Sequence, residues 1–384
     1  MSKRIIRFSF VFLLVFAMLF AAVGAAGAPL SQDSLTCLSG YGASRSYGQA
    51  GYFSLSRTPS LKATASSYKD LKLYVGGMPF GVKFLTEGVM VVGFGAVKTA
   101  NGSVSPAEQA GLRASDVIVK INGQTVTDAA AVTDITEKCG GNAIQIVYSR
   151  DGKQASTTLS PALSSEDGKY KTGMFVRDSG AGIGTVTYIV PETLAFGGLG
   201  HGICDGETGK LIPMQRGSVV GVTINGVVKG LSGSPGEVKG YFSSGKTGTL
   251  LTNTECGVFG AFASLPEAAT GEPVSIATRD QLKTGKAYIL STLDGTTPQK
   301  YEIEISDIKL NSTSNKCFTV KVTDPALIEK SGGIIQGMSG SPIIQNGKLV
   351  GAVTHVLVND PTAGYGIFIE NMLNAAQVPM AKVS

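Results

Sequence analysis

Tryptophan is absent from this 384-residue chain, and histidine occurs only twice, as His201 and His355. Hydrolytic zinc sites commonly take two or three histidine ligands, so a metal hydrolase of that kind is poorly supported. Charged residues are also few, at 16%, and Lys3, Arg4 and Arg7 supply three of the five net positive charges. The small remaining excess gives no electrostatic basis for binding nucleic acid.

Cysteine is sparse, and no two cysteines stand in a C-x-x-C spacing. A zinc site is therefore not expected, and the sequence gives no reason to expect any other metal or a cofactor. The count of five is odd, so at least one thiol is unpaired if every disulfide lies within the chain. We expect buried free thiols, and the sequence leaves any pairing open for Cys37, Cys139, Cys204, Cys256 and Cys317.

Long amphipathic helical patterns are scarce, whereas glycine is abundant, with 51 residues. Short runs rich in valine, isoleucine and threonine alternate with glycine-containing turns, which is typical of β-strands. The chain length suits two domains. Composition and pattern together predict a mainly β protein.

The N-terminus has the layout of a targeting segment. Lys3, Arg4 and Arg7 precede an apolar run from Phe8 to Phe20, and small residues follow up to Ala28. Residues 1–28 are therefore expected to be a signal peptide or a membrane anchor, and the sequence leaves cleavage and retention both open. Residues 29–70, rich in serine, glycine and tyrosine, are expected to be a linker.

Residues 71–160 have the element order of a PDZ domain. The phrase SPAEQAGLRASDVIVKINGQ predicts a short helix ending near Gly111, a strand over 117–121 and a turn at Asn122-Gly123; a helix over 128–139 follows. It resembles PDZ domains of exported proteases, which bind an extended peptide as an added strand. Gly81, Val82 and Phe84 match the peptide-binding loop and strand of that fold. The alternative is that these residues only serve turns and the core.

The remaining chain, residues 170–384, is one β-rich block that ends in GGIIQGMSGSPIIQNGKLVGAVTHVLV. In this run Ser339 stands in a glycine-containing turn, and a hairpin with an Asn346-Gly347 turn follows. The pattern resembles the G-x-S-G-x-P signature of chymotrypsin-like peptidases. It predicts Ser339 as a nucleophile, with the N–H groups of Gly337 and Ser339 as the oxyanion hole. A plain turn between strands is the alternative.

A serine nucleophile needs a base, which an acid usually orients. His201 lies between glycines after a predicted strand and is the favoured base, whereas His355, within the strand after the serine, is better placed to contact substrate or to pack. The pattern at Ser232 echoes the one at Ser339, but no buried hairpin follows it, so we expect a turn there. The residues alone leave the acid open, with these candidates: Asp205, Glu255, Asp280, Asp294, Asp307 and Asp324.

From about residue 167 to the C-terminus the chain resembles the SpoIVB serine peptidase family, with LAFGGLGHGICD, TNTECGVFGAF and the run from VTDPALIEK to GYGIFIENML as matching segments. The resemblance implies a PDZ domain before a peptidase domain with a trypsin-like double β-barrel, and a catalytic triad of His201, Asp324 and Ser339. Asp324 precedes Ser339 by only 15 residues, unlike the acid of most chymotrypsin-like enzymes. Its role is therefore either to orient His201 or to shape the nucleophile loop.

The resemblance also implies partners and a location. The family cleaves itself and a membrane-bound regulator of an intramembrane protease, which activates a late sporulation sigma factor, in the intermembrane space of the forespore. The PDZ domain in this family regulates the peptidase and binds a peptide. The residues themselves support an exported serine endopeptidase with a PDZ domain, and the rival interpretation is a catalytically silent peptide-binding PDZ protein.

Overall fold

The structure is a computed structural model that describes residues 71–269 and 271–376. The predicted signal or anchor segment and the predicted linker lie outside the described residues. All described residues belong to one compact unit. Within the described part of the chain, no helix is long and apolar enough to cross a membrane.

The first barrel is a sheet of long antiparallel strands that closes on itself, because β11 pairs with β12 along one edge and with β2 along the other. The order around it follows from the pairings of β12 with β15, β15 with β14, β14 with β13 and β13 with β2. Its strands are β2 (Pro79–Phe94), β11 (Met174–Ile189), β12 (Ala195–Gly198), β13 (Met214–Val228), β14 (Glu237–Thr254) and β15 (Gly257–Phe262). Two short strands extend the same sheet beyond β11, namely β1 (Lys72–Val75) and β16 (Val274–Ser275).

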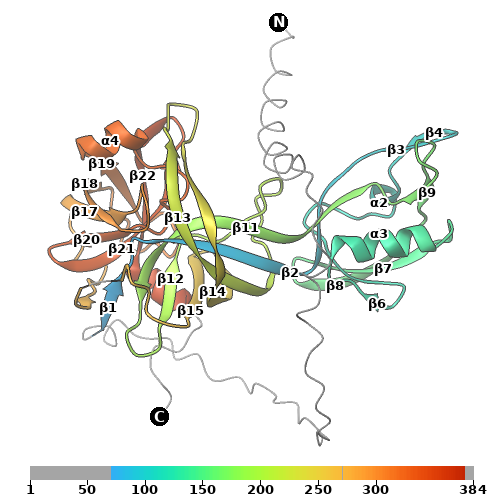
Figure 1. Ribbon diagram of the computed structural model, residues 1–384. Helices are drawn as coiled ribbons and strands as arrows, with labels where there is room; N and C mark the ends of the chain where they lie inside the picture. The colour runs from blue at the N-terminus through green and yellow to red at the C-terminus, as the bar shows by residue number, and fades with distance from the viewer. Residues whose placement is uncertain (1–70, 270, 377–384) are drawn as a thin grey trace, which may run out of the picture. The chain divides into compact units, whose positions relative to one another are not determined.

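The second barrel is closed and consists of six antiparallel strands. In barrel order these are β17 (Gly285–Ser291), β18 (Gln299–Ser306), β19 (Phe318–Val322), β22 (Asp360–Phe368), β21 (Lys348–Leu357) and β20 (Pro342–Gln345). Helix α4 (Pro325–Ser331) follows β19, and helix α5 (Ile369–Ala375) follows β22. The two barrels confirm the expected mainly β, chymotrypsin-like double-barrel fold (Figure 1).

The PDZ elements lie between β2 and β11 in the sequence, and both long strands connect them with the first barrel (Figure 1). They are β3 (Val97–Thr99), β4 (Gly102–Val104), α2 (Pro106–Gln109), β5 (Val117–Ile121), β6 (Gln124–Thr125), α3 (Ala129–Lys138), β7 (Ile144–Arg150), β8 (Lys153–Leu159), β9 (Ala162–Leu163) and β10 (Tyr170–Lys171). The PDZ unit is thus inserted within the first barrel instead of preceding the peptidase.

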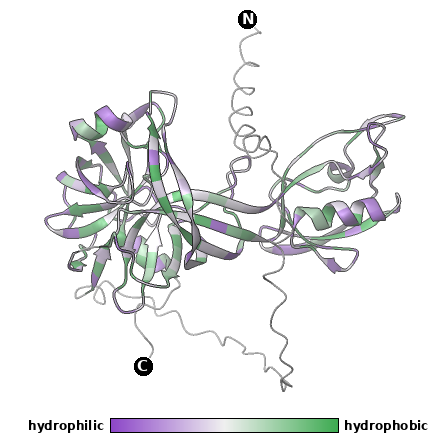
Figure 2. Cartoon of the chain, viewed as in Figure 1, coloured by the Kyte–Doolittle hydropathy of each residue, from purple (hydrophilic) through white to green (hydrophobic). Residues whose placement is uncertain are grey.

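Three apolar cores match this division. One fills the second barrel and includes Met338 beside Ser339, one fills the first barrel, and one lies between α3 and the PDZ strands. Figure 2 shows the barrel strands banded with apolar and polar residues, as expected for strands that bury one face. The loops that carry His201 and Ser339 are anchored in these cores by Leu199 and by Ile334, Ile335 and Met338.

Candidate active site

Ser339 lies in the loop between α4 and β20 and is partly exposed. The predicted hairpin follows at once, with β20 and β21 paired antiparallel and the turn at Asn346 and Gly347 in the left-handed region, at φ 52° and 74°. Such φ values at both turn positions are those of the tight hairpin turn that asparagine-glycine favours. The hairpin is buried on the barrel side, so the loop that carries Ser339 starts from a rigid base.

The backbone N–H groups of this loop fall into two sets. Those of Met338, Gly340 and Ser341 donate hydrogen bonds to carbonyl oxygens at 3.1, 2.8 and 2.9 Å. Those of Gly337 and Ser339 donate none to any described residue. Two unpaired donors beside one hydroxyl are what an oxyanion hole requires, and they belong to the two residues that the sequence predicts.

Two threonines of β11 hold the nucleophile loop from the first barrel. Thr185 donates from its N–H to the carbonyl of Ser339 at 3.0 Å and from its hydroxyl to the carbonyl of Gly337 at 2.7 Å. The Thr187 hydroxyl donates to the carbonyl of Gly340 at 2.8 Å. These two residues were missed from the sequence, although their alternation with apolar residues in TVTYIV places both hydroxyls on one face of a buried strand.

His201 follows β12 in a loop that packs on the second barrel. Its Nδ1 is 2.9 Å from the carbonyl oxygen of Gly202. A carbonyl only accepts hydrogen bonds, so Nδ1 carries the proton and Nε2 keeps its lone pair, which is the tautomer a general base needs. Burial lowers the pKa of His201 below its usual value, although the bond to Gly202 opposes this. The ring is therefore neutral at neutral pH.

No hydrogen bond joins Ser339 to His201 in this structure. The Ser339 hydroxyl donates instead to the carbonyl of Thr354 at 2.7 Å. Thr354 also contacts the histidine loop, since a Cβ on Gly200 would lie 2.9 Å from its methyl group. The Ser339 hydroxyl and the loop that carries His201 therefore share Thr354 of β21 as a neighbour.

His355 is the next residue of β21, and its ring lies against that of His201, with centroids 4.8 Å apart. Burial, then the neighbouring His201 and Lys316, lower the pKa of His355 to about 4. Its Nδ1 is buried without a hydrogen-bond partner among the described residues. The sequence places His355 in a strand after the nucleophile but gives no sign that it contacts the base.

Asp324 does not contact His201 through a hydrogen bond. One carboxylate oxygen accepts from the N–H groups of Ala326 and Leu327 at 2.9 and 3.1 Å, and the other accepts from Glu302 N–H at 3.1 Å. Asp324 is the N-cap of α4, and its backbone is extended, as expected for the residue before Pro325. Of the two roles left open by the sequence, this geometry supports shaping the loop that leads to Ser339.

Replacing Asp324 separates the two roles. We expect Asp324→Asn to keep most of the activity, because an amide oxygen can still accept from the first turn of α4. Asp324→Ala should lower the free energy of unfolding by about 0.5–2 kcal/mol, as for other lost N-caps. Turnover and melting temperature of both variants are the measurements. The matched control is Asp128→Ala, which removes the N-cap of α3 and should lower stability without changing turnover.

A loss of about 10⁴-fold in turnover for a folded Asp324→Asn enzyme would contradict the loop-shaping role, because a triad with an amide in place of the acid loses that much. Another candidate acid is already committed elsewhere. Asp205 is buried, pairs with Arg177 and accepts from the N–H groups of Glu207 and Thr208.

The expectation for the PDZ groove at Gly81, Val82 and Phe84 is corrected by the structure. All three residues lie in the half of β2 that belongs to the first barrel, paired with β11 at one edge and with β13 at the other. Val82 and Phe84 are buried in the core of that barrel. A strand with both edges paired cannot receive a peptide as a further strand. The alternative interpretation, in which these residues serve the core, therefore applies.

Gly81 gives a direct test of this correction. A Cβ on Gly81 would lie 2.5 Å from the Phe242 ring and 2.6 Å from a methyl group of Val220. We expect Gly81→Leu to destabilise the barrel by about 1–3 kcal/mol, as overpacking does, and to lower the melting temperature. Gly182→Leu is the control, since Gly182 lies in the neighbouring strand β11, paired with Val82, with nothing within 4 Å of its Cβ position. A fully stable Gly81→Leu protein that no longer binds a peptide would restore the groove assignment.

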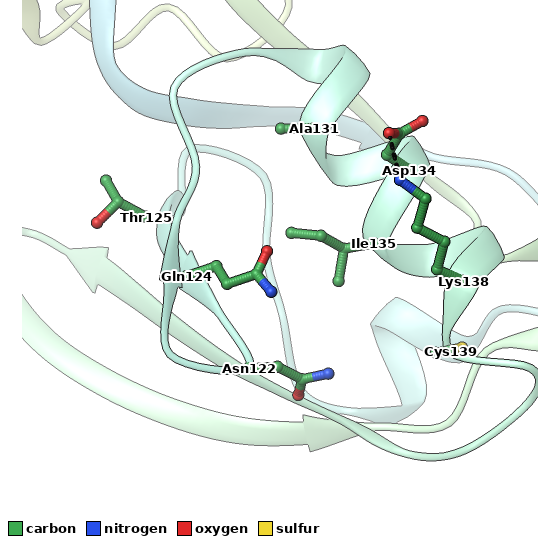
Figure 3. A pocket seen from close by; sticks show the side chains of 8 residues that line it. All are labelled: Asn122, Gln124, Thr125, Ala131, Asp134, Ile135, Lys138 and Cys139. Atoms are coloured by element: carbon green, nitrogen blue, oxygen red, sulfur yellow. Dashed lines mark hydrogen bonds and ion pairs between the residues drawn. The ribbon is translucent and has the colours of Figure 1, made fainter.

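The PDZ unit presents other surfaces. A hollow lies between α3 and the turn after β5, where Gln124 and Ile135 face each other and an ion pair of Lys138 with Asp134 lies at 2.9 Å (Figure 3). Over residues 174–177, β11 pairs with β2 along one edge, and no described strand pairs with the other. This unpaired edge begins next to the residues that contact α3.

Two further expectations concern side chains outside this site. The Ser232 hydroxyl is exposed and donates to the carbonyl of Asn359 at 2.9 Å, within a tight turn, as expected.

The four described cysteines are free thiols, of which only Cys317 is buried and Cys204 is exposed. Within the described residues no group of three or more histidine, cysteine or acidic side chains is placed to hold a metal ion.

Comparison with known proteins gives two family matches. The family model for the SpoIVB peptidase S55 matches residues 168–373, and one for the PDZ domain matches residues 103–150. Among solved structures, the active form of the Rv3671c protease from M. tuberculosis is 17% identical, covering 53% of this chain and 80% of that one, with a TM-score of 0.31. The PDZ domain of the SdrC-like protein from Listeria monocytogenes is 22% identical, covering 23% of this chain and 87% of that one, with a TM-score of 0.20. The first family match spans more than half of the chain, which therefore belongs to the SpoIVB S55 peptidase family and carries a PDZ domain.

Proposed function

We propose that the protein is a serine endopeptidase in which Ser339 attacks the peptide carbonyl carbon and His201 acts as the base. One observation carries the proposal: Ser339 stands beside two unpaired N–H donors, on a loop packed against the loop that holds His201 in its basic tautomer. A Cβ on Gly340 would lie 2.5 Å from the backbone nitrogen of Leu199, two residues before His201. The two loops are therefore in direct contact.

The reaction follows from these groups. The Ser339 oxygen bonds to the carbonyl carbon while its proton moves to Nε2 of His201, and the N–H groups of Gly337 and Ser339 bind the carbonyl oxygen as it becomes negative. His201 then gives the proton to the leaving amine as the C–N bond breaks, which leaves an acyl-enzyme. Water then attacks this ester and gives a proton to His201, which passes it to the Ser339 oxygen as the ester C–O bond breaks, so that the carboxylic acid and the free serine are released.

A fluorophosphonate probe tests the proposal directly, because it reacts with an activated serine and with no ordinary hydroxyl. We expect the wild-type protein to be labelled at Ser339, and His201→Ala to be labelled far more slowly. A folded protein that takes no label would favour the rival function, a catalytically silent peptide-binding PDZ protein.

The PDZ domain is proposed to bind a peptide ligand and to regulate the peptidase. The support is the unpaired edge of β11 over residues 174–177, since strand addition needs such an edge. Hydrogen–deuterium exchange on full-length Ser339→Ala protein, with and without a pool of free C-terminal peptides, tests this. Protection should appear in residues 174–177, and protection confined to other strands would contradict the assignment.

Location and substrates are part of the same proposal. The targeting pattern of residues 1–28 and the family membership support export into the intermembrane space of the forespore, with release or anchoring decided by cleavage after the apolar run. The proposed substrates are the protein itself and a membrane-bound regulator of an intramembrane protease. Fractionation of cells and co-expression with such a regulator are the measurements, and an intact regulator beside active enzyme would contradict the substrate.

A further inference from the structure

The side chain of His355 contacts the proposed base from a different element of the fold. It lies on β21, in the second barrel, whereas His201 lies in the loop after β12, in the first. The two imidazole planes are inclined by 36°, with their centroids 4.8 Å apart. The rings therefore pack against each other in a tilted arrangement, within the centroid separation of interacting aromatic pairs.

The backbone next to His355 also holds the nucleophile. The carbonyl oxygen of Thr354 accepts the Ser339 hydroxyl at 2.7 Å, and the Thr354 hydroxyl donates to Asn315 and Tyr365 carbonyls at 2.8 and 3.2 Å. Thr354 is thus fixed on both sides. One short piece of β21 sets the position of the serine oxygen with residue 354 and contacts the histidine ring with residue 355.

His201 lacks the usual support from a carboxylate. The carbonyl that accepts from its Nδ1 belongs to Gly202, its own neighbour, so this bond fixes the tautomer but moves with the loop. The Asp324 carboxylate is engaged by three backbone N–H groups. The contact that the structure shows between the His201 ring and a side chain of another element is with His355.

We propose that His355 is a positioning residue for His201, and that it fixes the orientation of the base imidazole by ring packing. This inference rests on the proposed function, because it assigns a partner to the base named there. During attack, the proton of Ser339 passes to Nε2 of His201, and His355 neither gains nor loses a proton.

The charge state of His355 fits this role. The charged and titratable groups that act on it are His201 and Lys316, and both, together with burial, lower its pKa to about 4. At neutral pH the ring is therefore uncharged. A charged His355 would oppose the imidazolium that forms on His201, whereas a neutral ring leaves that charge unopposed.

Ring packing and proton transfer by His355 are separated by three substitutions. In His355→Phe a flat ring remains, so kcat should stay within about a factor of ten of wild type. A modest shift of the ring should lower the rate by less than the roughly 10²-fold that a 1 Å misplacement costs. In His355→Leu and His355→Gln the ring is lost, so kcat should fall by about 10²-fold with little change in KM. Rates are measured on full-length protein and normalised to the folded fraction from circular dichroism. Val358→Ala, just beyond β21 and exposed, is the control and should keep wild-type activity.

Wild-type kcat in folded His355→Leu or His355→Gln would overturn the proposal, because it would show that the ring only fills space. A His355→Phe protein as inactive as His201→Ala would also overturn it, because proton transfer would then involve His355 itself. Fluorophosphonate labelling of the wild-type protein tests the proposed function separately, since it depends on an activated Ser339 and not on any change at His355. If wild-type Ser339 is labelled and the His355 variants behave as above, only the role of His355 is overturned.

Discussion

Replacing Ser339 with alanine should abolish self-processing and cleavage of added substrates, with a loss on the order of 10⁶-fold in turnover. The oxygen that forms the acyl-enzyme is removed, and the other nearby hydroxyl of this run, on Ser341, is buried. Purified Ser339→Ala protein should remain full length on incubation, and it should take no fluorophosphonate label. Its melting temperature should stay close to that of wild type, because the hydroxyl makes one hydrogen bond, to Thr354.

Ser232→Ala is the matched control, since it removes a serine from the same local pattern, Gly-x-Ser-Gly-Ser-Pro, at an exposed turn. It should retain labelling and turnover. If purified Ser339→Ala protein still trims its own N-terminal region, Ser339 is not the nucleophile. Loss of trimming in Ser232→Ala alone would move the assignment to that turn.

Local chemistry explains which parts of the fold could be predicted from the sequence. The PDZ helix at Pro106–Gln109, the strand Val117–Ile121 and the helix Ala129–Lys138 are where the sequence predicts them. Each is bounded by a residue with its own conformational preference: Gly111 at φ 80° ends the first helix, and Asp128 caps the last. Signals of this kind act within a few residues, so no long-range information is needed to read them.

The boundary of the PDZ unit could not be read in this way. The run from Pro79 to Phe94 is one apolar strand, and the same alternation suits a strand in a PDZ sheet or in a barrel. Its first half pairs with β13, whose partner residues lie more than a hundred positions away, and its second half pairs with β5. A period-2 pattern fixes which face is buried but does not identify the neighbouring strand, so the resemblance of Gly81, Val82 and Phe84 to a peptide-binding loop and strand was misleading.

The candidate site was partly readable for a similar reason. Ser339 and His201 stand in glycine-rich loops whose composition is unusual, so sequence alone singles them out. Thr185 and Thr187 lie inside an ordinary strand, and their importance depends on which loop packs over it. Asp324 was singled out by family motif and by Pro325, and the same proline that makes its backbone extended also starts the helix that its carboxylate caps.

The attachment of the nucleophile loop to β11 leads to a second large effect, at Gly340. This residue has φ 95°, and a Cβ there would lie 2.0 Å from the carbonyl oxygen of Thr185 and 2.5 Å from the backbone nitrogen of Leu199. Both are backbone atoms, which cannot move aside as a flexible side chain can. We expect Gly340→Ala to push the loop away from β11, and to displace the N–H of Ser339 from the position where the oxyanion forms.

Loss of one oxyanion donor costs about 10²–10³-fold in turnover, and we expect Gly340→Ala to lose at least that much. Gly347→Ala is the matched control. Gly347 also has a positive φ, 74°, but nothing lies within 4 Å of its Cβ position, so alanine there adds backbone strain without a collision. Both variants should lose some thermal stability from the positive φ, and only Gly340→Ala should lose turnover beyond its loss of folded protein. Equal turnover per folded molecule in the two variants would show that the loop does not need its close approach to β11.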